Sequence, residues 1–63
     1  MMTDTQSQIV IAMRRANRAM TQGDIAKATD LDAGEVLKDV LALGAAGYLR
    51  KAGSFYALVR ARR

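Results

Sequence analysis

The chain has 63 residues, of which ten are Lys or Arg and six are Asp or Glu, giving a formal net charge of +4. It contains no cysteine and no histidine, which excludes disulfides and thiolate metal sites and removes the commonest metal ligand. This length predicts a single domain over residues 1–63, and the positive charge favours a polyanionic partner.

The charge is unevenly distributed along the chain. Between residues 22 and 42, five acidic residues accompany only two lysines. The basic residues on either side of this segment are Arg14, Arg15 and Arg18 before it, and Arg50, Lys51, Arg60, Arg62 and Arg63 after it. We therefore expect a polyanion to contact the flanks of this segment more than its centre.

The first predicted element is an amphipathic helix over about residues 6–20, preceded by a terminal segment, residues 1–5, that we expect to be disordered. Apolar residues recur every three or four positions, as one face of a helix requires. They are Ile9, Ala12, Met13, Ala16, Ala19 and Met20. The opposite side holds Ile11, Arg14, Arg15 and Arg18. That side is either a solvated basic face or a contact face for a partner.

A short helix is predicted over residues 22–29, because Thr21 and Asp24 have the spacing of a capping box. Ile25 lies on its inward side. The turn that follows places Leu31 over the core.

A longer helix is predicted over residues 33–46, because Asp32 and Glu35 repeat the capping-box spacing. Gly47 ends it, since glycine adopts the left-handed conformation without strain. Its inward residues are Val36, Val40 and Leu43. Its outward residues are Gly34, Lys38, Leu41, Ala42 and Ala45, with Glu35 and Asp39 at the edges. Among the outward residues, only Lys38 could donate hydrogen bonds to guanine.

From residue 48 the hydrophobic period changes to two, which predicts a β-hairpin with strands over residues 48–51 and 55–60 and a turn at residues 52–54. The inward side of the hairpin holds Leu49, Tyr56 and Leu58, and the outward side holds Arg50, Phe55 and Val59. Because an isolated hairpin is unstable in water, we expect it to pack against the helices.

Residues 25–51 resemble the winged helix-turn-helix of small bacterial and archaeal transcription regulators. The matching residues are Ile25, Ala26 and Ala28 in the first helix, Leu31 and Asp32 in the turn, Val36, Val40 and Leu43 in the second helix, and Gly47, Tyr48, Leu49, Arg50 and Lys51 at the start of the wing. With the returning strand, the resemblance covers about residues 13–60. It implies an α+β fold of three helices followed by a two-stranded β-hairpin, the wing.

The resemblance also implies a cytoplasmic DNA-binding regulator, with helix 33–46 in the major groove and the wing on the phosphate backbone. The implied DNA contacts are Gly34, Lys38, Leu41, Ala42, Arg50, Lys51, Ser54 and Arg60. Such regulators bind as dimers to half-sites about one helical turn apart. The candidate contacts with a partner or a second copy are Ile11, Arg14, Arg15, Arg18, Phe55 and Val59.

A second function remains open, because winged helices also serve as adaptors that bind other proteins. In that case the apolar strip of Gly34, Leu41 and Ala45 would bind the partner, while Glu35 and Asp39 would repel DNA. No catalytic pair, nucleotide-binding loop or membrane-spanning stretch is present in the sequence. The sequence therefore predicts a protein that is not an enzyme and that binds no cofactor, metal, membrane or small-molecule ligand.

Overall fold

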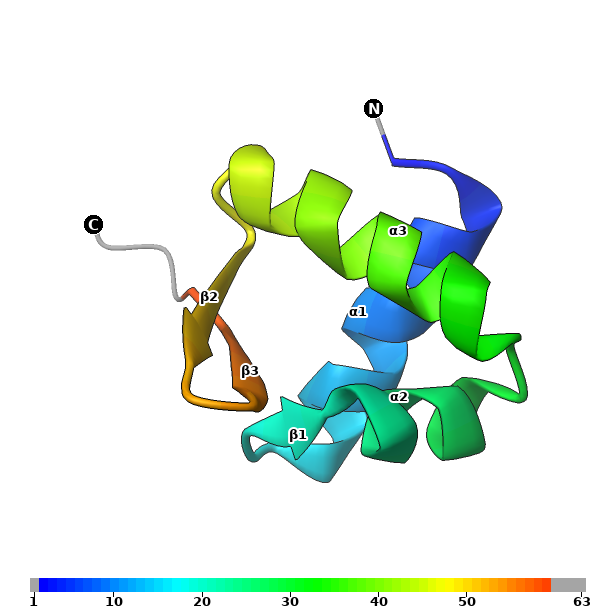
Figure 1. The fold of residues 1–63 in the computed structure, drawn as a ribbon, viewed down its shortest axis with the longest axis horizontal. Helices are drawn as coiled ribbons and strands as arrows, with labels where there is room; N and C mark the ends of the chain where they lie inside the picture. The colour runs from blue at the N-terminus through cyan, green and yellow to red at the C-terminus, as the bar shows by residue number, and fades with distance from the viewer. Residues whose placement is uncertain (1, 60–63) are drawn as a thin grey trace.

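The computed structural model describes residues 2–59. Its elements are α1 (Asp4–Ala16), β1 (Met20–Thr21), α2 (Gln22–Thr29), α3 (Ala33–Ala45), β2 (Leu49–Ala52) and β3 (Phe55–Leu58). Figure 1 shows the helices gathered on one side and the β2–β3 hairpin on the other. This α+β layout of three helices followed by a hairpin confirms the predicted fold class.

Helix α1 begins earlier and ends earlier than the predicted range of 6–20. Thr3 forms a capping box with Gln6, in which each backbone N–H donates to the other side chain at 3.2 Å. The helix therefore includes Asp4, within the segment 1–5 that was predicted to be disordered. It ends at Ala16 because Asn17 takes the left-handed conformation, with φ 53°.

Because α1 ends early, Met20 and Thr21 can form the short strand β1, which was not predicted. Met20 pairs with Tyr56, and Thr21 pairs with Phe55, in an antiparallel register. The sheet has the strand order β1-β3-β2. The predicted two-stranded wing is present as the β2–β3 hairpin, and β1 extends it to a three-stranded sheet within residues 2–59 that ties the hairpin to the helices.

Helix α2 has its predicted bounds, and its capping box is confirmed. The Asp24 N–H donates to Thr21 Oγ1 at 3.1 Å, and the Thr21 N–H donates to Asp24 Oδ2 at 3.2 Å. At α3 the predicted box of Asp32 with Glu35 is wrong. Asp32 Oδ2 accepts from the Gly34 N–H at 2.9 Å, whereas Glu35 Oε2 accepts from the Thr5 hydroxyl at 3.1 Å.

Helix α3 ends at Ala45, one residue before the predicted end, in a glycine-terminated Schellman motif. The Tyr48 N–H donates to the Leu43 carbonyl at 2.9 Å, and the Gly47 N–H donates to the Gly44 carbonyl at 3.1 Å. Gly47 has φ 91°, so its predicted left-handed conformation is confirmed. This motif turns the chain from α3 directly into β2.

The hairpin is tighter than predicted. Ala52 pairs with Phe55, which leaves a two-residue turn of Gly53 and Ser54. Gly53 has φ 63°, as the first position of such a turn requires. Strand β3 ends at Leu58 rather than at residue 60, and residue 60 lies outside the described part of the chain.

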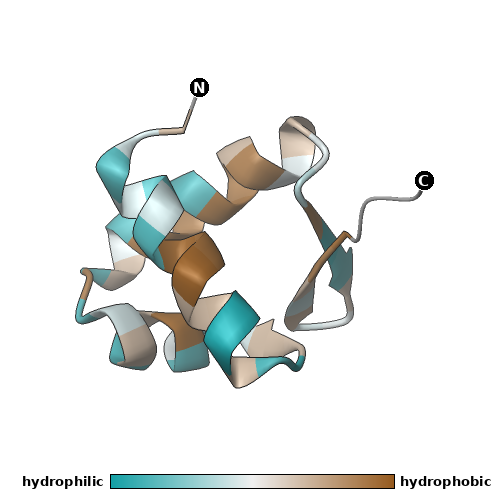
Figure 2. Cartoon of the chain, turned by 180° about the vertical axis from the view of Figure 1, so that it is seen from behind, coloured by the Kyte–Doolittle hydropathy of each residue, from teal (hydrophilic) through white to brown (hydrophobic). Residues whose placement is uncertain are grey.

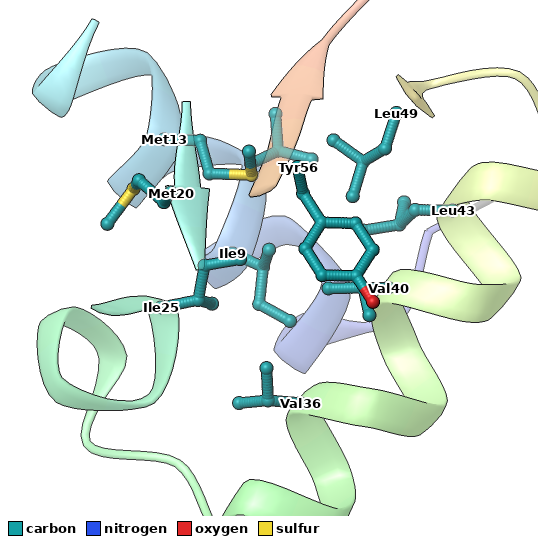
Figure 3. Close-up of a cluster of buried hydrophobic side chains, with 10 residues drawn as sticks. Ile9, Met13, Met20, Ile25, Val36, Val40, Leu43, Leu49 and Tyr56 are labelled. Atoms are coloured by element: carbon teal, nitrogen blue, oxygen red, sulfur yellow. The ribbon is translucent and has the colours of Figure 1, made fainter. Parts of the chain in front are cut away.

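The core lies where the helices meet the sheet. Its buried apolar residues are Ile9, Val10, Met13, Met20, Ile25, Val36, Val40, Leu43, Leu49 and Tyr56. Figure 3 shows these side chains converging from all three helices, β1 and the hairpin. In Figure 2 the middle of α1 is strongly hydrophobic, and its carboxyl-terminal end is hydrophilic. The predicted inward residues Ile9, Ile25 and Tyr56 are confirmed in the core.

The start of α2 gives stability a dependence on pH. The pKa of Asp24 lies below its ordinary value of 3.8, mainly because the Thr21 N–H donates to its carboxylate, with Arg18 Nη1 3.6 Å away. A carboxyl whose pKa is lower in the folded state stabilises the fold fully above its unfolded pKa. We expect this contribution to fall as pH drops from about 3.8 through the folded pKa.

Denaturant unfolding between pH 2 and pH 7 would measure this effect. Asp24→Asn, which keeps an oxygen acceptor for the Thr21 N–H, should flatten part of the acid limb of the stability curve. Identical pH profiles for the native protein and this variant would contradict the assignment.

Candidate nucleic-acid interface

The outward face of α3 has the predicted position. Gly34, Lys38, Leu41, Ala42 and Ala45 are all exposed. Leu41 has 61% of its surface accessible, the largest exposure among the large apolar side chains of residues 2–59. This face therefore presents small and apolar groups together with one cation, Lys38.

Lys38 is held by an acidic neighbour. Its Nζ lies 3.7 Å from Glu35 Oε1, one helical turn back, and the Lys38 side chain remains largely exposed. Glu35 also accepts the hydrogen bond from Thr5, so its carboxylate is anchored to the first turn of α1. The negative charge of Glu35 thus has a structural partner and a local counter-charge.

Asp39 does not lie at the edge of the outward face, and this part of the prediction is wrong. Only 2% of its surface is accessible, and its Oδ2 has no hydrogen-bond partner within residues 2–59. On α3 it lies beside the inward residues Val36, Val40 and Leu43 rather than among the outward ones. Its carboxylate is therefore not presented to a molecule that docks on the outward face.

The carboxylate of Asp32 caps the first turn of α3. Asp32 Oδ2 accepts from the Gly34 N–H, and a Cβ at position 34 would lie 3.0 Å from the same oxygen. Because Asp32 already accepts from this N–H, the first turn of α3 has one fewer free donor to offer an anion.

A groove of about 240 Å³ runs between α3 and β2. Its lining residues are Val40, Leu41, Gly44, Ala45, Leu49, Arg50, Lys51 and Tyr56. It brings together three of the predicted DNA contacts, Leu41, Arg50 and Lys51. Gly34, Lys38 and Ala42 lie elsewhere on the exposed surface of α3, and Ser54 lies at the hairpin turn. Arg60 is outside the described residues.

The two basic residues of this groove are positioned by β2. Lys51 pairs with Tyr56 across the sheet, and its Nζ lies 5.9 Å from the centre of the Tyr56 ring. Arg50 is exposed and lies on the opposite face of the strand, paired with Ala57. Within residues 2–59 neither residue forms an ion pair with a carboxylate. Both charges are thus available to an external anion.

The predicted partner contacts do not form one surface. Ile11 and Arg15 line a shallow groove against α2. Arg14, Arg18 and Val59 line a larger groove, of about 540 Å³, between α1 and the hairpin, and Phe55 lines neither. Arg18 also pairs with Asp24. These residues are exposed, but the structure divides them among separate places.

Two features of the α3 surface were not predicted from the sequence. Leu37 is 41% exposed. It lies one turn before Leu41, so the two leucines lie on one stripe. Gly44 lines the groove beside β2. The i, i+4 spacing of the leucines was visible in the sequence, whereas the contribution of Gly44 depends on where the hairpin packs.

No family model, curated protein or solved structure matches this chain. Within residues 2–59, no helix combines the length and the apolar character needed to cross a bilayer. Function is therefore inferred from the geometry of the groove between α3 and β2 and of the exposed face of α3 beside it. We call these together the α3–β2 surface.

Proposed function

We propose that this protein binds double-stranded DNA as a small transcription regulator, with α3 in the major groove and the hairpin on the adjacent phosphate backbone. The proposal rests on the groove in which Leu41 of α3 lies beside Arg50 and Lys51 of β2. A helix face rich in alanine and glycine can approach base edges, while cations beside it neutralise phosphates.

The dimensions of α3 support this proposal. Its 13 residues correspond to about 20 Å at about 1.5 Å per residue, and a helix about 10–12 Å across enters a major groove about 12 Å wide. Alanines and glycines on the outward face keep the effective diameter small. The α3 surface is thus compatible with insertion into a groove.

The burial of Asp39 and the pairing of Glu35 weaken the main objection to DNA. In the alternative of a protein-binding adaptor, both carboxylates would repel phosphates, yet one is buried and the other lies beside Lys38. The charges available at the α3–β2 surface are therefore mainly those of Arg50 and Lys51. Release of counterions from the phosphates that they contact would supply most of the affinity.

A protein partner is the second candidate, favoured by the exposed stripe of Leu37 and Leu41. An apolar stripe on a helix is a common anchor in protein interfaces. Arg50 and Lys51 lie beside Leu41 in the groove, and two cations next to a helix suit the phosphates of a duplex. We therefore place DNA first.

Binding to a mixed-sequence duplex across a salt series tests the proposal. Contacts from Lys38, Arg50 and Lys51 predict a slope of log affinity against log salt of about −2.7 per protomer, at about −0.9 for each phosphate. Light scattering on the same samples would give the number of protomers. Absence of binding at low salt, or binding with no salt slope, would contradict DNA as the partner and favour a protein.

A further inference from the structure

The outward face of α3 is apolar where a DNA-reading helix commonly carries hydrogen-bonding groups. We propose that α3 reads the C5-methyl groups of thymine, so that the protein prefers A·T-rich duplexes through apolar contacts made chiefly by Leu41. This inference rests on the proposed DNA binding and names the class of duplex that the same surface would select.

Few side chains on α3 can read bases by donating hydrogen bonds. The exposed face contains no Arg, Asn or Gln, the residues that form bidentate contacts with guanine or adenine. Its single cation, Lys38, lies 3.7 Å from Glu35. A contact of Lys38 with guanine would have to compete with this ion pair. A G·C pair facing α3 would therefore add little to the binding affinity.

Thymine is the base that offers an apolar group in the major groove. Leu41 is 61% exposed and lines the same groove as Arg50 and Lys51. When these two cations contact phosphates, Leu41 is held close to the neighbouring base edges. Contact with a methyl group removes apolar surface of both partners from water, which stabilises the complex.

The residues around Leu41 permit this approach. Ala42, Gly44 and Ala45 are exposed and have at most a methyl group as side chain. The α3 backbone can therefore come near the groove floor without displacing bulky groups. Leu37, one turn before Leu41, extends the apolar stripe toward the start of the helix.

Duplexes that differ only in the methyl group provide the test. Affinity is measured at low salt for an alternating dA·dT duplex and for a dA·dU duplex of the same length. Each methyl group buried by the native protein is expected to raise affinity about fourfold over the uracil duplex. Leu41→Ala should reduce this ratio toward one, while Gln8→Ala, at an exposed position on α1, should leave it unchanged.

Three results would overturn the inference. Equal affinity of the native protein for the two duplexes would show that methyl groups are not read, and would leave the proposed DNA binding intact. If Leu41→Ala keeps the preference for thymine, the preference arises from the shape of the duplex and not from contact between Leu41 and the methyl group. Failure to bind either duplex would overturn the proposed function as well.

Discussion

Replacing Ile9 by alanine is expected to destabilise the domain by about 2–5 kcal/mol, the range for removing a buried isoleucine side chain. Ile9 is completely buried at the centre of the core (Figure 3). A domain of this length has a total stability of roughly 3–9 kcal/mol, at about 0.05–0.15 kcal/mol per residue. Ile9→Ala should therefore leave a substantial unfolded fraction, measurable by urea unfolding followed by circular dichroism.

Ile11→Ala is the matched control, because it is the same substitution two residues away in the same helix. Ile11 is 49% exposed, and a surface change of this kind usually alters stability by less than about 0.5 kcal/mol. A loss at Ile11 as large as the loss at Ile9 would contradict the packing of α1. It would indicate that Ile11 is covered in solution, for example by a second copy.

The double substitution Arg50→Ala and Lys51→Ala is expected to weaken binding to duplex DNA of any sequence. Both residues line the groove beside Leu41 and form no ion pair within residues 2–59. The loss of two phosphate contacts should reduce the salt slope by about 1.8, at about 0.9 for each. Fluorescence anisotropy over a salt series would measure the slope and the affinity together.

Arg14→Ala with Arg15→Ala is the control for net charge, because it also removes two positive charges. These residues are exposed on α1 and line other grooves. The salt slope of this variant should stay close to that of the native protein, with folding checked by circular dichroism. If both double variants lower the salt slope of DNA binding equally, DNA contacts basic residues over the whole surface of the protein. The α3–β2 surface would then not be the DNA interface.

The elements set by local signals were predicted well. Helix α2 has its predicted bounds because the Thr21–Asp24 box defines its start, and Gly47 ends α3 because a left-handed residue is needed there. The end of α1 had a local signal too. Asn17 readily adopts the left-handed conformation, but the apolar spacing that continued to Met20 suggested a longer helix.

The candidate site was predicted less completely, because it combines segments that are distant in the sequence. The outward positions of α3 follow from helical spacing alone, and Leu41 and Lys38 are exposed as expected. Spacing could not show that Asp39 is buried, since this residue lies between the outward and inward sides of the helix. Nor could it show that Arg50 and Lys51 share a groove with Leu41.

By itself the sequence determined the capped start of α2, the N-cap of α3 at Asp32 and the glycine that ends α3, because these depend on residues within one or two turns of each other. Only the tertiary structure decided the pairing of Met20 with Tyr56, the burial of Asp39 and the groove between α3 and β2. Each of these depends on where the returning chain packs. A two-residue strand such as β1 carries no periodicity of its own, and it exists because β3 offers it hydrogen-bond partners.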